Sequence, residues 1–130
     1  MSNIKEKLQE KISVGRERVT KLLKQHGNVK ISDVTVAQAI GGARGVKCLV
    51  TDISYLDPNE GIRFRGYTIP ETLEKLPKVP GSDMPYVEGH LHLLLTGEIP
   101  TEGEALELAE MLRERQQVPQ YVIDILRAMP

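Results

Sequence analysis

The first apolar positions of the chain recur with the period of an α-helix. They step by 4, 4, 3, 4 and 3 residues along Ile4, Leu8, Ile12, Gly15, Val19 and Leu22. Steps of three and four place side chains on one face of a helix. Asn3 and Glu6 have the spacing of a capping box, and Gly27 is suited to follow the last turn. The pattern predicts a helix over residues 3–25 with one apolar stripe.

Short β elements are predicted between residues 29 and 69. "NVKISDV" predicts a short strand, and Thr35 with Gln38 predicts a brief helical turn, "VAQAI", that ends at the two glycines after it. "CLVTDISYL" and "IRFRGYTI" are β-rich runs on either side of "DPNEG", a sequence typical of a turn. Together they predict a β-hairpin.

Helical patterns return over residues 70–129. Thr68 and Thr101 each stand three residues before a glutamate, which is the spacing of a capping box, and Gly97 and Pro119 mark the end of one helix and the start of another. The expected helices cover residues 68–76, 86–96, 101–117 and 119–129. The β elements are too few for a doubly wound sheet, so the sequence predicts a mainly α fold with a small hairpin.

Composition narrows the class of protein. The 130 residues carry 17 basic and 18 acidic side chains, a net charge of −1, so no overall field favours nucleic acid or an anionic membrane. One cysteine, Cys48, forms no internal disulfide, which favours a reducing compartment. The start, "MSNIKEKLQEKI", has the features of neither a signal peptide nor a mitochondrial presequence, and no apolar run approaches a membrane span. These features predict a cytoplasmic protein.

The stretch "AIGGARGVK", residues 39–47, is the strongest candidate for chemistry. It lacks the spacing of a dinucleotide fingerprint and the Gly-Lys-Ser/Thr of a P-loop. Glycines leave backbone amides uncovered, and a guanidinium can hold a phosphate with two parallel hydrogen bonds. The residues alone leave two readings open: Arg44 binds an anion, or the segment is a plain turn.

Two histidines and two arginines have structural explanations. His90 and His92 are two residues apart on a predicted helix and point about 200° apart, so they do not bind one metal ion; one is expected inward and one outward, with His92 near Glu88. On a strand, Arg63 and Arg65 would share one face and form ion pairs with neighbouring aspartates, Asp52 or Asp57. No arrangement for nucleophilic catalysis and no metal site is predicted.

Longer strings resemble a known family. "TVAQAIGGARGVKCLVTDISYLDPNEGIRFRGYTIPE" and "EGHLHLLLTGEIPTEGE" strongly resemble the N-terminal portion of citrate synthase, and the similarity runs from the first helix to the last residue. The resemblance implies a multi-helical fold, a homodimer with a large and a small domain, and acetyl-CoA and oxaloacetate as substrates, with no covalently bound cofactor. It also implies that Arg44, in the motif "GG-x-RG", helps to hold the 3′-phosphate of coenzyme A.

The resemblance also implies that the catalytic residues are elsewhere. The two histidines and one aspartate of the family lie in downstream segments such as "GPLHG" and "PGYGHA", and neither string occurs in this sequence. The leading hypothesis is an N-terminal fragment of a bacterial citrate synthase, residues 1–130 of an incomplete large domain, that is inactive alone. It is expected to self-associate, because the helix carrying Leu91, Leu93, Leu94 and Leu95 is apolar all round. The alternative is a natural short paralogue that acts as a CoA-binding or subunit-docking regulatory module.

Overall fold

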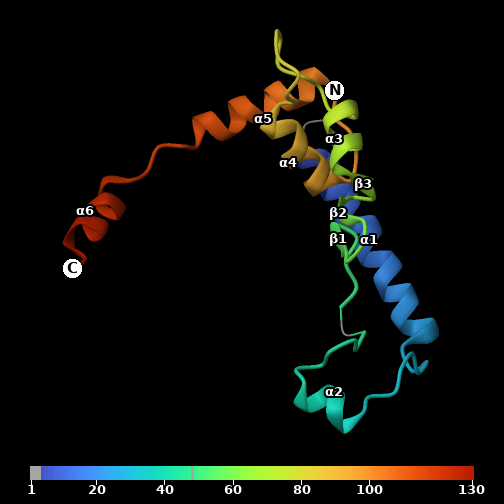
Figure 1. Ribbon diagram of the computed structural model, residues 1–130. Coiled ribbons are helices and arrows are strands. Elements are labelled where there is room, and N and C mark those ends of the chain that lie inside the picture. Colours follow the sequence, from blue (N-terminus) through green and yellow to red (C-terminus); the bar gives the residue numbers. More distant parts are fainter. Residues whose placement is uncertain (1–3, 48) are drawn as a thin grey trace.

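The computed structural model describes residues 4–47 and 49–130 (Figure 1). The fold of these residues is mainly helical with one small sheet, as predicted. The helices are α1 (Ile4–His26), α2 (Val36–Ile40), α3 (Ile69–Lys75), α4 (Val87–Thr96), α5 (Glu102–Glu114) and α6 (Gln120–Ala128). The antiparallel sheet has the order β1 (Ser54–Asp57), β2 (Gly61–Phe64) and β3 (Tyr67–Thr68).

Helix α4 lies at the centre of the packed part of the chain. It contacts α1 on one side and α5 on another, while α3 packs on β2 and β3. Leu93 and His92 of α4 are the largest fully buried side chains, and the other buried apolar residues are Ile4, Leu76, Ala105 and Leu108. We call α1, the sheet, α3, α4 and α5 the body.

Two segments extend away from the body (Figure 1). One is the arm, residues 27–47, which contains α2. The other is α6, which follows residues 115–119 of irregular structure. Most of their large apolar side chains are exposed: Val29, Ile31, Val34, Val36 and Ile40 in the arm, and Tyr121, Ile125 and Leu126 in α6.

Hydrogen bonds at the helix ends confirm the sequence signals. Complete capping boxes begin three helices, at Thr35, Thr68 and Thr101. Gly97 ends α4 in the left-handed conformation with φ of 78°, and its amide donates to the carbonyl of Leu93. The end of α1 depends on Gly27, since a Cβ added there would lie 2.5 Å from the Leu23 carbonyl oxygen. Asn3, the expected cap of α1, lies outside the described residues.

Three predicted boundaries or elements are wrong. Residues 28–34 form no strand but an exposed irregular segment, because no neighbouring chain is present to accept the hydrogen bonds of a strand. The hairpin begins at Ser54 rather than near Cys48, which itself lies outside the described residues, and its second run divides into β2 and β3. Helix α5 ends at Glu114, before the predicted residue 117.

Ion pairs attach α1 to Glu98, which follows α4, and to Glu104 in the first turn of α5. The ammonium of Lys7 pairs with Glu104 and lies 3.6 Å from a carboxylate oxygen of Glu98, which also pairs with Lys11 at 2.5 Å. The hydrogen bond from Lys7, together with the backbone amide of Thr101, lowers the pKa of Glu104 to about 2. The pKa of Glu98 is lowered as well, chiefly by Lys11. Glu104 therefore serves both the cap of α5 and the docking of α1.

Changing Glu104 to glutamine tests the docking separately from the cap, because glutamine also completes a capping box. A carboxyl whose pKa is lowered on folding stabilises the fold above its ordinary pKa of 4.5, and this stabilisation is lost as the pH falls toward 2. We expect E104Q to reduce the free energy of unfolding by about 1 kcal/mol at pH 7. The difference from the unchanged chain should shrink between pH 4.5 and pH 2, as measured by urea denaturation. A difference that is the same across this range would contradict the role of the charge.

Candidate functional site

The glycine-rich loop is an exit from α2, as predicted. The amides of Gly41, Gly42 and Ala43 donate back to carbonyls of α2, at 2.9, 3.3 and 2.8 Å. Three of the next residues have left-handed backbone conformations: φ is 77° at Gly42, 59° at Ala43 and 72° at Gly45. Glycine adopts this conformation without steric strain, which explains two of these positions.

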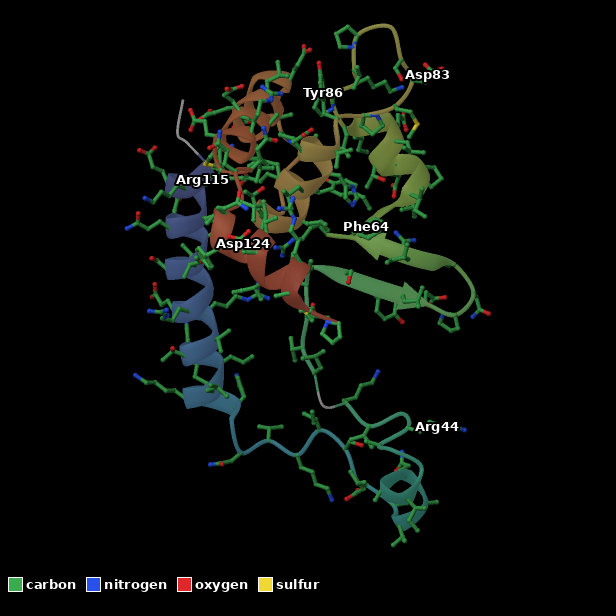
Figure 2. All side chains as sticks on the ribbon, turned by 90° about the vertical axis from the view of Figure 1, so that its left-hand side faces the viewer. Arg44, Phe64, Asp83, Tyr86, Arg115 and Asp124 are labelled. Carbon is green, nitrogen blue, oxygen red and sulfur yellow. The ribbon has the colours of Figure 1, made fainter. Side chains whose placement is uncertain are left out.

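Arg44 lies at the outer side of this loop. Its side chain is exposed, and Figure 2 shows it on the arm, well separated from the body. Within residues 4–47 and 49–130, neither its guanidinium nor its backbone amide has a partner, and only its carbonyl accepts a hydrogen bond, from the Gln38 side chain at 3.3 Å. Both donor groups of this arginine are therefore available to an anion.

The sequence analysis missed the second role of Gln38. Its carboxamide oxygen completes the capping box with Thr35, while its nitrogen reaches the Arg44 carbonyl. The sequence contained a signal for this second contact. Either Glu or Gln can complete a capping box, but only the glutamine side chain carries a donor as well as an acceptor. Gln38 thus links the start of α2 to the loop that follows it.

Arg63 and Arg65 do not share a strand face. Arg65 has φ of 51° and lies with Gly66 in the turn between β2 and β3. Its guanidinium donates to the Leu94 carbonyl at 2.7 and 2.9 Å and pairs with Asp52 at 3.0 Å, while Arg63 pairs with Glu60 at 2.6 Å. The expected pair with Asp52 is confirmed, and Arg65 in addition caps the C-terminal end of α4. Both arginines are occupied by structural contacts.

The expected inward histidine is His92, but the expected outward histidine is not found, because His90 packs against Phe64. His92 is 1% exposed, whereas His90 is half-buried and meets the ring of Phe64 edge to face at 4.7 Å. The expected pairing of His92 with Glu88 is wrong, since its Nδ1 lies 3.3 Å from both the Glu98 carbonyl and the Thr96 hydroxyl. In the part of the chain that the structure describes, no group of three His, Cys, Asp or Glu side chains is arranged to hold a metal ion.

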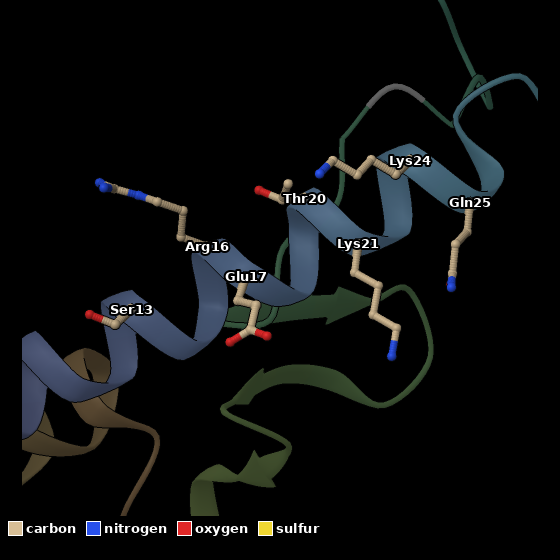
Figure 3. Close-up of a pocket in the computed structure, with 7 residues that line it drawn as sticks. All are labelled: Ser13, Arg16, Glu17, Thr20, Lys21, Lys24 and Gln25. Carbon is tan, nitrogen blue, oxygen red and sulfur yellow. The ribbon is translucent and has the colours of Figure 1, made fainter.

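A hollow along α1 is not a converging site. Its lining consists of seven polar side chains from this one helix: Ser13, Arg16, Glu17, Thr20, Lys21, Lys24 and Gln25. Figure 3 shows them in two rows that point to different sides of the helix. Because no second element faces them, the hollow is the solvated face of α1. Arg44 and most described residues of the arm around it are exposed, so the groups that Arg44 offers to a ligand are exposed donors.

Comparison with known proteins places this fold in a family. The family model described as "Citrate synthase, C-terminal domain" matches residues 42–130, a range that includes Arg44. The chain is 49% identical over 128 residues to the mitochondrial citrate synthase of Aspergillus niger, and 46% identical over 127 residues to that of Saccharomyces cerevisiae. It is 44% identical over 127 residues to the mitochondrial 2-methylcitrate synthase of Yarrowia lipolytica. These alignments cover 98% of this chain.

The fold and the comparisons together assign the chain to a known family. The chain belongs to the citrate synthase family. It spans only 26–27% of the length of the three relatives named above. Their names place these relatives in mitochondria, so they give no support to the expected bacterial cytoplasmic location. Among the described helices, none has the length and apolar character required to cross a membrane.

Replacing Arg65 tests whether its hydrogen bonds to the end of α4 stabilise the fold. Arg65→Ala removes charge-assisted hydrogen bonds to the end of α4, and we expect it to reduce the free energy of unfolding by about 1.5–3 kcal/mol. Asp52→Asn is the matched control, because Asp52 is exposed and its loss should cause a change of less than about 1 kcal/mol. Urea denaturation of both variants measures the two values. Equal losses would show that the carbonyls of α4 do not depend on Arg65.

Proposed function

We propose that this chain is the N-terminal part of the large domain of a citrate synthase. This enzyme condenses acetyl-CoA with oxaloacetate to give citrate and coenzyme A, an acyl transfer that forms a carbon–carbon bond. The observation that carries the proposal is 44–49% identity across nearly the whole chain to three synthases of which it covers about a quarter. In the complete enzyme the chain would belong to one subunit of a homodimer.

Arg44 is the residue of this chain proposed to contact the substrate. Its exposed guanidinium and backbone amide have no partner in the described chain, and it follows a left-handed residue in a glycine-rich loop. A guanidinium fork matches the geometry of a phosphate group. These features support the role that the motif implies, in which Arg44 holds the 3′-phosphate of coenzyme A.

A second candidate reaction is the synthesis of 2-methylcitrate. It is favoured by one observation: a 2-methylcitrate synthase is almost as similar to this chain as the citrate synthases, at 44% against 46% and 49%. A methyl-substituted product requires an acyl group one carbon longer. Comparison of kcat/KM for acetyl-CoA and propionyl-CoA in the complete enzyme would separate the two reactions.

We expect the 130-residue chain alone not to condense acetyl-CoA with oxaloacetate. No residue of the chain is assigned a catalytic role, and general acid–base groups each contribute about 10²- to 10⁴-fold to a rate. The measurement is release of free thiol from acetyl-CoA, with full-length enzyme excluded by intact-mass analysis. Turnover above a control without protein would contradict the expected inactivity. The alternative, a natural short paralogue that acts as a CoA-binding or subunit-docking regulatory module, is tested by comparing the intact mass of the expressed protein with its open reading frame.

We also expect the isolated chain to self-associate. The reason inferred from the sequence, an α4 that is apolar all round and needs partners, is wrong. Leu93 of α4 is buried, and only Leu95 of its four leucines is exposed, at 43%. The support comes instead from apolar side chains of the arm and α6, such as Ile40 at 83% exposed. Such surfaces require partners. Sedimentation at tens of micromolar measures the association, and a single monomeric species that binds no hydrophobic dye would contradict it.

Changing Arg44 tests the phosphate contact directly. A charge-assisted hydrogen bond contributes about 1.5–3 kcal/mol, which corresponds to about 10- to 150-fold in affinity. In the complete enzyme, Arg44→Ala should raise the KM for acetyl-CoA by a factor in this range and leave kcat nearly unchanged, because the phosphate is remote from the reacting methyl group. Lysine should restore part of the affinity, since it carries the charge without the planar fork.

Acetyl-dephospho-CoA, which lacks the 3′-phosphate, is the control ligand. The unchanged enzyme should bind it more weakly than acetyl-CoA, whereas Arg44→Ala should bind both with nearly equal affinity. If the unchanged enzyme and the variant discriminate equally between the two thioesters, Arg44 does not contact that phosphate.

A further inference from the structure

The carboxamide of Gln38 is held at both ends. Its Oε1 accepts hydrogen bonds from the amide and the hydroxyl of Thr35, at 3.0 and 3.2 Å, while its Nε2 donates to the Arg44 carbonyl at 3.3 Å. The reversed orientation would set the NH₂ group against the Thr35 amide and the oxygen against the Arg44 carbonyl. A donor would then face a donor at Thr35, and an acceptor would face an acceptor at Arg44. The hydrogen-bond network therefore fixes the orientation of this side chain.

Gln38 also holds the loop through its backbone. Its carbonyl accepts from the Ala43 amide at 2.8 Å, and the Ala43 carbonyl in turn accepts from the Val46 amide at 3.0 Å. The residues immediately before and after Arg44 have no other hydrogen bonds to the rest of the described chain. Among the described residues, Gln38 is therefore the one outside the turn that bonds directly to Arg44 and to the residue before it.

Packing supplies little further restraint. Across residues 27–45, all of which the structure describes, every side chain except that of Gln38 is exposed. A loop without packed neighbours keeps one conformation through its hydrogen bonds alone. An arginine on a loose loop would lose backbone entropy on binding, at about 1–2 kcal/mol for each residue that becomes ordered. A restraint already present in the free protein removes part of that loss and strengthens binding.

We infer that Gln38 is a positioning residue for phosphate recognition by Arg44, through the hydrogen bond from its Nε2 to the Arg44 carbonyl. This inference rests on the proposed role of Arg44 as the contact to the 3′-phosphate of coenzyme A. Gln38 itself touches no substrate. It holds the Arg44 turn in one conformation, so its loss weakens binding of the phosphate-bearing thioester without slowing the reaction of bound substrate.

Three variants of the complete enzyme separate the contributions of this side chain. Gln38→Glu keeps the acceptor for the capping box and removes the donor to Arg44. Gln38→Met removes both polar functions without adding a charge. Thr35→Ala weakens the cap of α2 and leaves the Gln38–Arg44 hydrogen bond in place, so it is the matched control. Each variant is also made in combination with Arg44→Ala.

Both Gln38 variants are expected to raise the KM for acetyl-CoA about 2- to 12-fold, the range for one neutral hydrogen bond, with kcat unchanged. Their KM for acetyl-dephospho-CoA should equal that of the unchanged enzyme. In combination with Arg44→Ala, neither Gln38 variant should raise the KM for acetyl-CoA beyond the value for Arg44→Ala alone. Thr35→Ala should leave the preference between the two thioesters unchanged. If Gln38 served only the cap of α2, Gln38→Met and Thr35→Ala would instead raise the KM for both thioesters, and Gln38→Glu, which keeps the cap acceptor, would have little effect.

Each other outcome overturns the inference in an identifiable way. An effect of Gln38→Glu without one of Gln38→Met would show that the introduced charge acts, not the lost donor. Unchanged ligand preference in both Gln38 variants, with the preference for the phosphate-bearing thioester lost in Arg44→Ala, would reject the role of Gln38 alone and leave the proposed function intact. If Arg44→Ala itself does not alter the preference, the proposed contact and the positioning role fail together.

Discussion

The burial of α4 is the constraint on which the body depends. Leu93 and His92 are enclosed because α1 and α5 both pack against this helix. A helix with so many apolar side chains requires such neighbours, since each buried leucine contributes about 1.5–3 kcal/mol relative to exposure. The sheet joins the same arrangement through Arg65, whose guanidinium donates to the last carbonyls of α4. Gly97 therefore ends α4, and Arg65 links this end of the helix to the turn between β2 and β3.

The conformation of the arm depends on hydrogen bonds rather than on a buried core. Its side chains are almost all exposed, and its conformation is carried by hydrogen bonds among residues close in sequence. The candidate phosphate-binding residue therefore stands on a part of the chain that no core holds. Under the proposed function, we expect changes in the body to affect stability and changes around Gln38 and Arg44 to affect recognition. The two properties can be measured independently.

The surface of the chain agrees with the proposal that it is part of a larger domain. Apolar side chains on the arm and α6 are exposed, and the chain spans about a quarter of its relatives. In the proposed setting these surfaces pack against the remainder of the domain and the second subunit. The donors at Arg44 are then presented to substrate from a loop bounded by other parts of the enzyme.

What the sequence determined by itself is what depends on neighbours within a few residues. The capping boxes at Thr35, Thr68 and Thr101, the end of α4 at Gly97 and the exit of α2 through its glycines were all predicted, because each is made by groups three to five residues apart. The helical periods were predicted for the same reason. The motif around Arg44 also identified the family, which the comparisons confirm.

Only the tertiary structure decided the contacts between distant residues. The strand expected over residues 28–34 does not form, because a strand requires a partner and sequence periodicity does not supply one. Arg65 leaves the strand and caps α4, which lies about thirty residues further along the chain, and His92 bonds to the Glu98 carbonyl rather than to Glu88. A left-handed turn at Arg65 and the burial of one helix face set these contacts, and neither is encoded by the local pattern of polar and apolar residues.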